Sequence, residues 1–153
     1  MATTTMVFSS HTATVTITDF TELNSTDSIN LIATDGTNYD FDNGDHSSVN
    51  GTWEATTSNE VTATSLMNVI NTSSGPAGTR FSASVDGAVV TITQNASGSN
   101  GNTAITLTDT GSAGMTKTDF VGGLEPTRTM NLIMPNVPGS GTNTTTLRIR
   151  GYQ

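Results

Sequence analysis

Short stretches of this chain alternate apolar residues with threonine at a period of two. The clearest stretch is 12–18, where Ala13, Val15 and Ile17 are separated by threonines. Successive side chains of a β-strand point to opposite faces, so this period predicts a strand with one buried and one solvated face. A chain patterned in this way is expected to form sheets that cover a core on one side only.

The composition supports the same conclusion. Hydrophobic residues make up 33% of the 153 residues and charged residues only 12%. Disordered chains usually combine low hydrophobicity with high charge, and that combination is absent here. The remaining residues are mainly small, neutral and often β-branched, which suits the solvated face of a strand. The length corresponds to one ordinary domain.

Two hairpins are predicted from turn residues between alternating stretches. Around Asp35-Gly36, a two-residue loop would place an apolar residue opposite a polar one. A three-residue loop over 35–37 is therefore preferred, with Ala33 opposite Tyr39 and Leu31 opposite Phe41.

Around Asp86-Gly87 a two-residue loop keeps apolar residues on one face. It places Val85 opposite Ala88, Ala83 opposite Val90, and Phe81 opposite Ile92.

One helix is expected after residue 57. The run Thr57-Ser58-Asn59-Glu60 matches a capping box. Val61, Leu66, Val69 and Ile70 follow at close to helical spacing, and the run 73–76, which ends in Gly-Pro, should stop the helix.

Further strands are expected at 28–33, 103–108 and 116–121, and at 129–134 and 144–150 in the last part of the chain. The sequence thus predicts an α+β fold that is mostly β, with antiparallel hairpins around a sheet and one helix. We divide it into an N-terminal arm (1–11), a core domain (12–121) and a C-terminal β extension (122–153).

Charge and cysteine content exclude several function classes. Thirteen acidic residues against five basic ones give a net charge of −8. Nucleic-acid binding and docking on anionic lipid both need positive charge, so neither partner is expected. The absence of cysteine excludes disulfides and thiolate metal sites. The N-terminus does not match a signal peptide, and no segment has the apolar length of a membrane span.

No convergent set of catalytic residues can be found in the sequence. His11 and His46 lack nearby metal-ligand spacing, and we expect both to be exposed. There is no nucleophile elbow, phosphate-binding loop or zinc-protease motif. We therefore predict a protein without enzymatic activity, cofactor or metal.

Two weaker site candidates remain. Acidic residues gather between 35 and 54 and could ligate Ca²⁺: Asp35, Asp40, Asp42, Asp45 and Glu54. Their spacing does not match an EF-hand loop, and a solvated strand face accounts for Asp40 and Asp42. Trp53 and Tyr39 could form a platform for a sugar, although a buried aromatic pair is the commoner arrangement.

The order of these features resembles a known module. The residues concerned are Asp27-x-Ile29-x-Leu31, Asp35-Gly36-x-x-Tyr39-x-Phe41, Thr62-Ala63-Thr64-Ser65-Leu66, Val69-Ile70-Asn71, Phe81-Ser82-Ala83, Gly87-x-Val89-Val90-Thr91-Ile92-Thr93-Gln94 and Gly98-x-x-Gly101-Asn102-x-x-Ile105. Over residues 12–121 the chain resembles a small α+β module that recurs in virion proteins of tailed bacteriophages, especially marine ones. The resemblance implies a place in the particle and no catalytic activity. It transfers no site residues.

The resemblance leads to a structural function as the main expectation. We expect a capsid decoration (cement) protein on the outer surface of the virion, made in the host cytoplasm. Its partners would be the major capsid protein and further copies of itself. The predicted partner-binding residues are Arg128, Arg148, Arg150 and Tyr152, all in the C-terminal extension. The alternative is a tail, neck or fibre component that contacts a host glycan.

Overall fold

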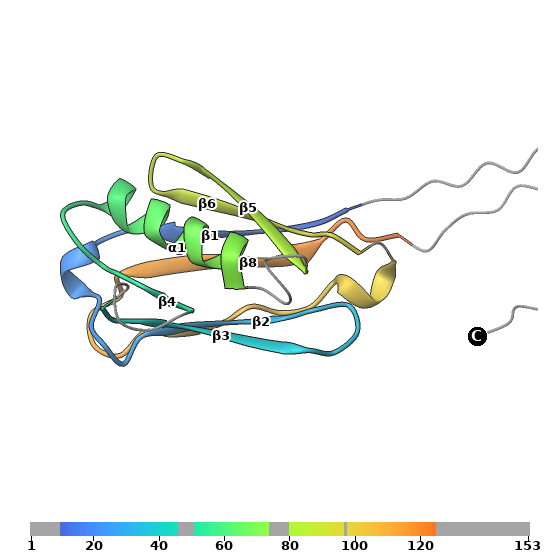
Figure 1. The fold of residues 1–153 in the computed structure, drawn as a ribbon, viewed down its shortest axis with the longest axis horizontal. Helices are drawn as coiled ribbons and strands as arrows, with labels where there is room; N and C mark the ends of the chain where they lie inside the picture. Colours follow the sequence, from blue (N-terminus) through green and yellow to red (C-terminus); the bar gives the residue numbers. More distant parts are fainter. Residues whose placement is uncertain (1–9, 46–50, 74–79, 97, 125–153) are drawn as a thin grey trace, which may run out of the picture.

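A computed structural model describes residues 10–45, 51–73, 80–96 and 98–124 (Figure 1). Within these ranges the chain forms eight strands and one α-helix, which confirms an α+β fold that is mostly β. The elements are β1 (His11–Ile17), β2 (Ser28–Ile32), β3 (Asn38–Asn43), β4 (Thr52–Trp53), α1 (Asn59–Ser73), β5 (Phe81–Asp86), β6 (Val89–Gln94), β7 (Thr106–Thr108) and β8 (Met115–Val121), with short 3-10 turns η1 (Phe20–Glu22) and η3 (Ser99–Gly101).

The strands divide between two four-stranded sheets. Sheet A has the order β5-β6-β1-β8 and sheet B the order β4-β3-β2-β7. All pairs of the described strands are antiparallel except β3 with β4. The inner faces of the two sheets enclose the core, so the molecule is a sandwich. The alternation of single strands reveals which side of each is buried, but it does not reveal this division into two layers.

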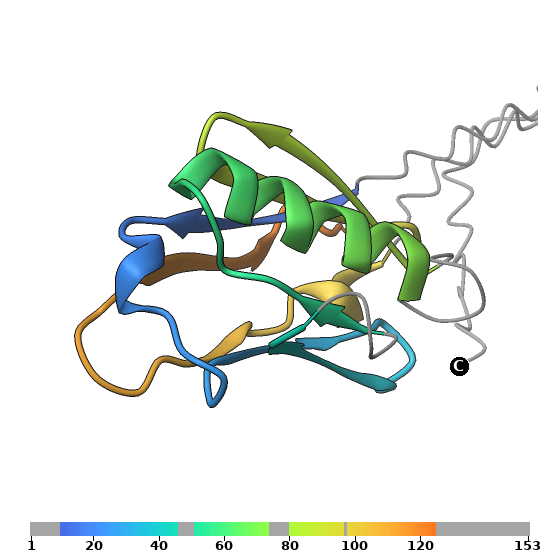
Figure 2. The same cartoon turned by 60° about the vertical axis from the view of Figure 1, so that its left-hand side comes forward.

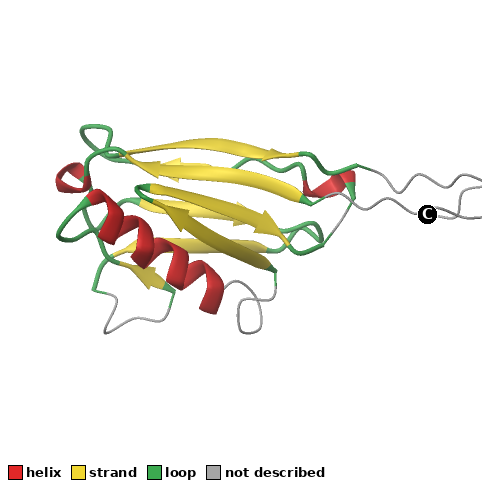
Figure 3. Cartoon of the chain, turned by 90° about the horizontal axis from the view of Figure 1, so that it is seen from above, coloured by secondary structure: helices red, strands yellow, loops and turns green. Residues whose placement is uncertain are grey.

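The helix α1 lies along the side of the sandwich where β5 and β4 are the edge strands (Figures 2 and 3). It packs against β5, β6, β1 and β4. Asn71 fastens it to the outer edge of β5, because its side chain donates to Ala83 O (2.9 Å) and accepts from Ala83 N (2.7 Å). An edge strand whose backbone groups are bonded in this way cannot pair with another chain there.

The helix begins one residue later than the capping box predicts. Ser58 is the N-cap, because its Oγ accepts from Val61 N (3.2 Å) and its carbonyl accepts from Thr62 N (3.0 Å). Thr57 lies outside the helix with a positive φ of 65°. The core side carries Leu66, Val69 and Ile70 as predicted, whereas Val61 is 43% exposed and does not belong to it.

The β2–β3 hairpin has the predicted loop length and face pairing, but its register is shifted by two residues. Leu31 pairs with Tyr39 and Ile29 with Phe41, so the predicted pairs are wrong. The three-residue loop is 34–36, closed by the Gly36 N–H donating to Ala33 O (2.8 Å). Gly36 has φ +83°, and the last residue of this loop type takes the left-handed conformation, which glycine adopts without strain.

The β5–β6 hairpin shows the same shift. Ala83 pairs with Ile92 and Val85 with Val90, so the two-residue loop is Gly87-Ala88 instead of Asp86-Gly87. Gly87 has φ +56°, and Ala88 is not among the residues with positive φ. This combination matches a type II′ turn, which needs glycine at its first position. In both hairpins the glycine's required position decides the register.

The core lies between the sheets and includes side chains from every layer. Trp53 from β4 is fully buried, and its Nε1 donates to Phe41 O (2.9 Å). One aromatic contact joins the two sheets, because Tyr39 of sheet B meets Phe81 of sheet A edge-on at 6.0 Å. Within sheet A, Phe81 also stacks on Phe120 at 5.6 Å. The contact between Tyr39 and Phe81 helps to fix the distance between the sheets.

Candidate functional site

Both ends of the described chain lie at one end of the sandwich, which we call the arm end. β1 enters there, and β8 leaves there beside it, with Thr12 paired to Val121. The segments before residue 10 and after residue 124 are therefore attached at neighbouring points (Figure 1). The opposite end, which carries η1 and the loop between β7 and β8, we call the turn end.

His11 is the central residue of the arm end. It is fully buried, so the expectation of an exposed arm residue is wrong, and β1 begins inside the predicted arm 1–11. Its Nε2 makes a hydrogen bond with Gly98 O, 87 residues along the chain. A neutral ring that donates from Nε2 leaves Nδ1 as an acceptor, and Nδ1 is buried with no partner among the described residues.

Two glycines make room for the imidazole ring. A Cβ on Gly101 would lie 2.5–2.7 Å from three ring atoms of His11, and a Cβ on Gly123 would overlap the ring as well. Any larger residue at either position would force either the ring or the glycine's own segment to move. The loop before β7 and the exit of β8 thus close on the first residue of β1.

Two amide side chains complete this arrangement. The buried Gln94 donates from Nε2 to Gly101 O (2.9 Å) and accepts from the N–H of Thr34 (2.9 Å). The Asn102 side chain donates to Gly123 O and accepts from Gly123 N, both at 3.0 Å. The β2–β3 turn, the 98–102 loop and the start of the C-terminal segment are therefore bonded to one another.

A shallow cavity of about 420 Å³ lies at the arm end, between the β2–β3 turn and the end of β6. Its lining includes Ala33, Asp35, Arg80 and Gln94. Arg80 and Asp35 form an ion pair across it, with side chains 36% and 49% exposed. Exposed pairs of this kind contribute little stability, so the pair acts mainly to define the shape of the rim.

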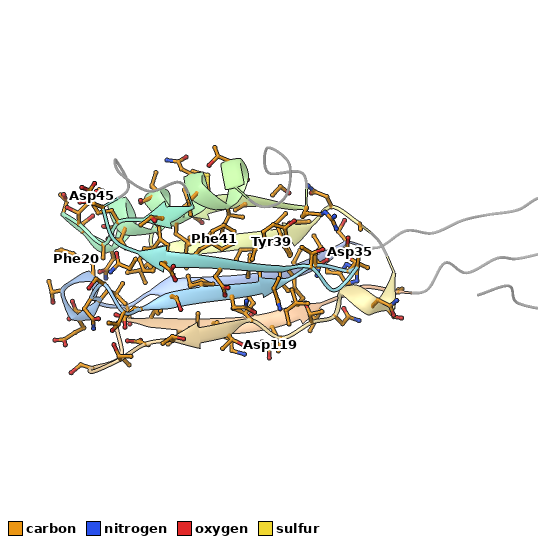
Figure 4. All side chains as sticks on the ribbon, turned by 60° about the horizontal axis from the view of Figure 1, so that its bottom comes forward. Phe20, Asp35, Tyr39, Phe41, Asp45 and Asp119 are labelled. Carbon is orange, nitrogen blue, oxygen red and sulfur yellow. The ribbon has the colours of Figure 1, made fainter. Side chains whose placement is uncertain are left out.

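The acidic residues between 35 and 54 do not form a cluster. Asp35 lies at the arm end and Asp45 at the turn end, separated by the length of β3 (Figure 4). Asp40 and Asp42 are exposed on the outer face of β3. Within the described ranges, no three His, Cys, Asp or Glu side chains converge enough to hold a metal ion. The geometry therefore gives no support to a calcium site there.

Trp53 and Tyr39 do not form a platform for sugar. Trp53 has no exposed surface, and Tyr39 is half-buried with its ring against Phe81. The ring that Tyr39 meets is Phe81 and not Trp53, so both residues contribute to the core but are not observed as a pair.

The predicted partner-binding residues Arg128, Arg148, Arg150 and Tyr152 lie outside the described residues, as does His46. The arm end itself was not predicted as a site. The 98–102 stretch carries no catalytic or phosphate-binding motif, and its contact with His11 has no local sequence signal.

No protein-family model matches the sequence, and neither a curated protein nor a solved structure matches the chain. The described part contains no helix with the length and apolar character that crossing a membrane requires.

Proposed function

We propose that this protein is a non-enzymatic structural component of a tailed-phage particle and acts as a capsid decoration protein. The observation that carries the proposal is the arm end. Both terminal segments start from adjacent points on one end of a closed sandwich, which leaves the sheet faces and the helix to other contacts. In the proposed arrangement, the arms bind the capsid lattice, where an extended segment can add a strand to another chain's sheet edge, and the folded body faces outward.

The charge distribution supports the same role. Residues 125–153 carry three arginines against one glutamate, a net charge of +2, whereas residues 1–124 carry two basic and twelve acidic residues, a net charge of −10. The C-terminal segment is therefore the part suited to gripping an acidic surface. The acidic body would favour solubility on the outside of a particle.

The described polar side chains also support a structural role, because many are used in holding loops. Asp27 is fully buried and accepts from Asn24 N (2.7 Å) and Thr110 N (2.7 Å). Asp109 accepts from Gly114 N (3.0 Å) and Met115 N (3.2 Å). These carboxylates stabilise the turn end.

The test is reconstitution on heads of the parent phage that were assembled without this protein. Cryo-electron microscopy should show density repeated over the icosahedral lattice. Deleting 125–153 should abolish binding while circular dichroism shows an intact sandwich, since the truncation keeps Gly123 against His11. Density confined to the tail or a single vertex would identify a tail or neck component instead, and lattice binding by the truncated chain would overturn the role of the extension.

A further inference from the structure

The outer face of sheet B carries a pair of aspartates on β3. Asp40 and Asp42 are exposed and point away from the core. Residues two apart on a strand share a face at a separation of roughly 6.5–7 Å. Asn30, the neighbour of Asp40 on β2, donates from Nδ2 to Asp40 Oδ1 (2.7 Å) and so orients that carboxylate.

The strands beside this pair contribute only uncharged residues to the same face. Across β2 and β7, the residues in register with Asp42 are Ser28 and Thr108, and those in register with Asp40 are Asn30 and Thr106. The two basic residues of the described chain are engaged elsewhere, Arg80 with Asp35 and Lys117 with Asp119. Within the described part, the aspartate pair therefore has no basic partner.

The C-terminal segment contains a matching pair of arginines. In residues 144–150, Arg148 and Arg150 are two positions apart, with Leu147 and Ile149 in the alternate positions. An extended chain would place both guanidinium groups on one face at the same spacing as the two carboxylates. Arginine and carboxylate form two parallel hydrogen bonds, so the match is in geometry as well as charge.

We propose that residues 144–150 of one copy bind across the outer face of sheet B of a second copy, with Arg148 and Arg150 paired to Asp40 and Asp42. The second copy is the occupant we commit to, and binding to the same chain is the outcome that the test below separates from it. The extension starts after β8 of sheet A, at the arm end (Figure 1). The nineteen residues 125–143 can span up to roughly 60 Å, enough to reach a neighbour.

Each copy would then donate one segment and offer one face. Such head-to-tail contacts close into rings when the rotation between copies allows it. The inference does not depend on a location in a particle, because association of copies can be measured with purified protein. If the protein failed to bind phage heads, the proposed contact between copies would be unaffected. If the purified protein were monomeric, the proposed decoration role would be unaffected.

The experiment is sedimentation velocity over a concentration series of the full chain, at low and at physiological salt. The wild type should associate, and the association should weaken as salt rises. The double variants Asp40→Asn/Asp42→Asn and Arg148→Gln/Arg150→Gln should each weaken it roughly tenfold at low salt. The control Glu22→Gln/Asp86→Asn removes the same charge from exposed acids away from this face and should leave association unchanged.

A charge exchange makes the test specific. Asp40→Arg/Asp42→Arg alone and Arg148→Asp/Arg150→Asp alone should both be monomeric, and the chain that carries all four changes should associate again. If the control variant weakened association as much as the Asp40/Asp42 variant, net charge alone would explain the effect, and the proposed pairing would be overturned. A wild type that stays monomeric at all concentrations would overturn binding to a second copy. If hydrogen exchange then showed protection of 144–150, the segment would be bound to its own chain.

Discussion

The two ends of the sandwich are closed by different kinds of contact. At the turn end, carboxylates accept from backbone N–H groups of loops, as Asp27 does from Asn24 and Thr110. At the arm end, an imidazole ring lies between two glycines, and its hydrogen-bond partner is 87 residues away. Charge-assisted hydrogen bonds thus characterise the turn end, although Gly114 also packs closely against Leu23 there. At the arm end, packing around a ring is combined with uncharged amide hydrogen bonds. Substitutions should separate these two mechanisms.

The largest effect is expected from Asp27→Ala at the turn end. It leaves two backbone N–H groups and the Thr110 hydroxyl without their acceptor, and should lower the free energy of unfolding by about 3 kcal/mol. Urea denaturation followed by Trp53 fluorescence would measure this. Asp27→Asn keeps the shape and one acceptor oxygen and should lose less. The exposed Glu22→Ala should change stability by no more than about 0.5 kcal/mol. Equal losses of unfolding free energy for Asp27→Ala and Glu22→Ala would contradict the conclusion that Asp27 stabilises the turn end.

At the arm end, Gly101→Ala should cost roughly 2–3 kcal/mol, because the added methyl group would meet three ring atoms of His11. The cause can be isolated with His11→Ala, which removes the ring and leaves a cavity of its own. In the His11→Ala background, Gly101→Ala should cost much less than in the wild type. Additive losses in this double-mutant cycle would show that the ring is not the obstacle.

Gly123→Ala brings a methyl group to the same ring from the other side, but its effect should be smaller. Gly123 lies beyond Val121, the last paired residue of β8, so it can move away from His11 without breaking the strand pairing. The loss is then mainly the paired hydrogen bonds with Asn102, about 1–2 kcal/mol. Hydrogen exchange should show faster exchange at Gly123 with little change in β1 or β6. If Gly123→Ala lowered the free energy of unfolding as much as Gly101→Ala, residues 122–124 would be held against His11 as rigidly as the 98–102 loop.

Much of the strand pattern and the helix could be predicted from the sequence, because these elements depend on local rules. The buried faces of β1, β2, β5 and β6 follow the two-residue period, and α1 follows its cap and its apolar spacing. Both hairpin registers were wrong by two residues. A shift of two leaves the same faces together, so side-chain phase cannot detect it, and the conformation required of Gly36 and Gly87 decides the register.

The arm end could not be predicted in the same way. A lone histidine at the start of a strand is ordinarily exposed. His11 is in phase with the buried Ala13 and Val15, but the alternation does not show that the strand extends back to residue 11. The burial of His11 depends on Gly98, Gly101 and Gly123, which only the fold brings together. Trp53 is a related case, because its stretch is polar and irregular, yet β4 inserts it fully into the core. Long-range contacts that depend on glycine produce no periodic pattern in the sequence, so they cannot be predicted from it.

The smallest effect is expected from acid, which acts on Asp119 in β8 and on Asp19 at the turn end. The side-chain hydrogen bond from Lys117, helped by the backbone N–H of Ile105, lowers the pKa of Asp119 from its ordinary value of 3.8. At the turn end, the Thr21 side chain and N–H lower the pKa of Asp19 in the same way. A carboxylate with a lowered pKa stabilises the fold above the unfolded pKa, and this contribution is lost as pH falls through the folded value.

Stability should therefore decline slightly below about pH 4, and Asp119→Asn should make that decline shallower. Because Asp119 holds Ile105 N at 2.9 Å, acid or Asp119→Asn should speed hydrogen exchange at the entry to β7. Asp19→Asn should instead affect η1, where Asp19 Oδ1 accepts from Thr21 N (3.0 Å). Thermal melts between pH 3 and 6 with site-resolved exchange would test both. An unchanged pH slope in both variants would show that these exposed bonds do not contribute to folding, and would confine the charge-assisted contribution at the turn end to carboxylates such as the buried Asp27.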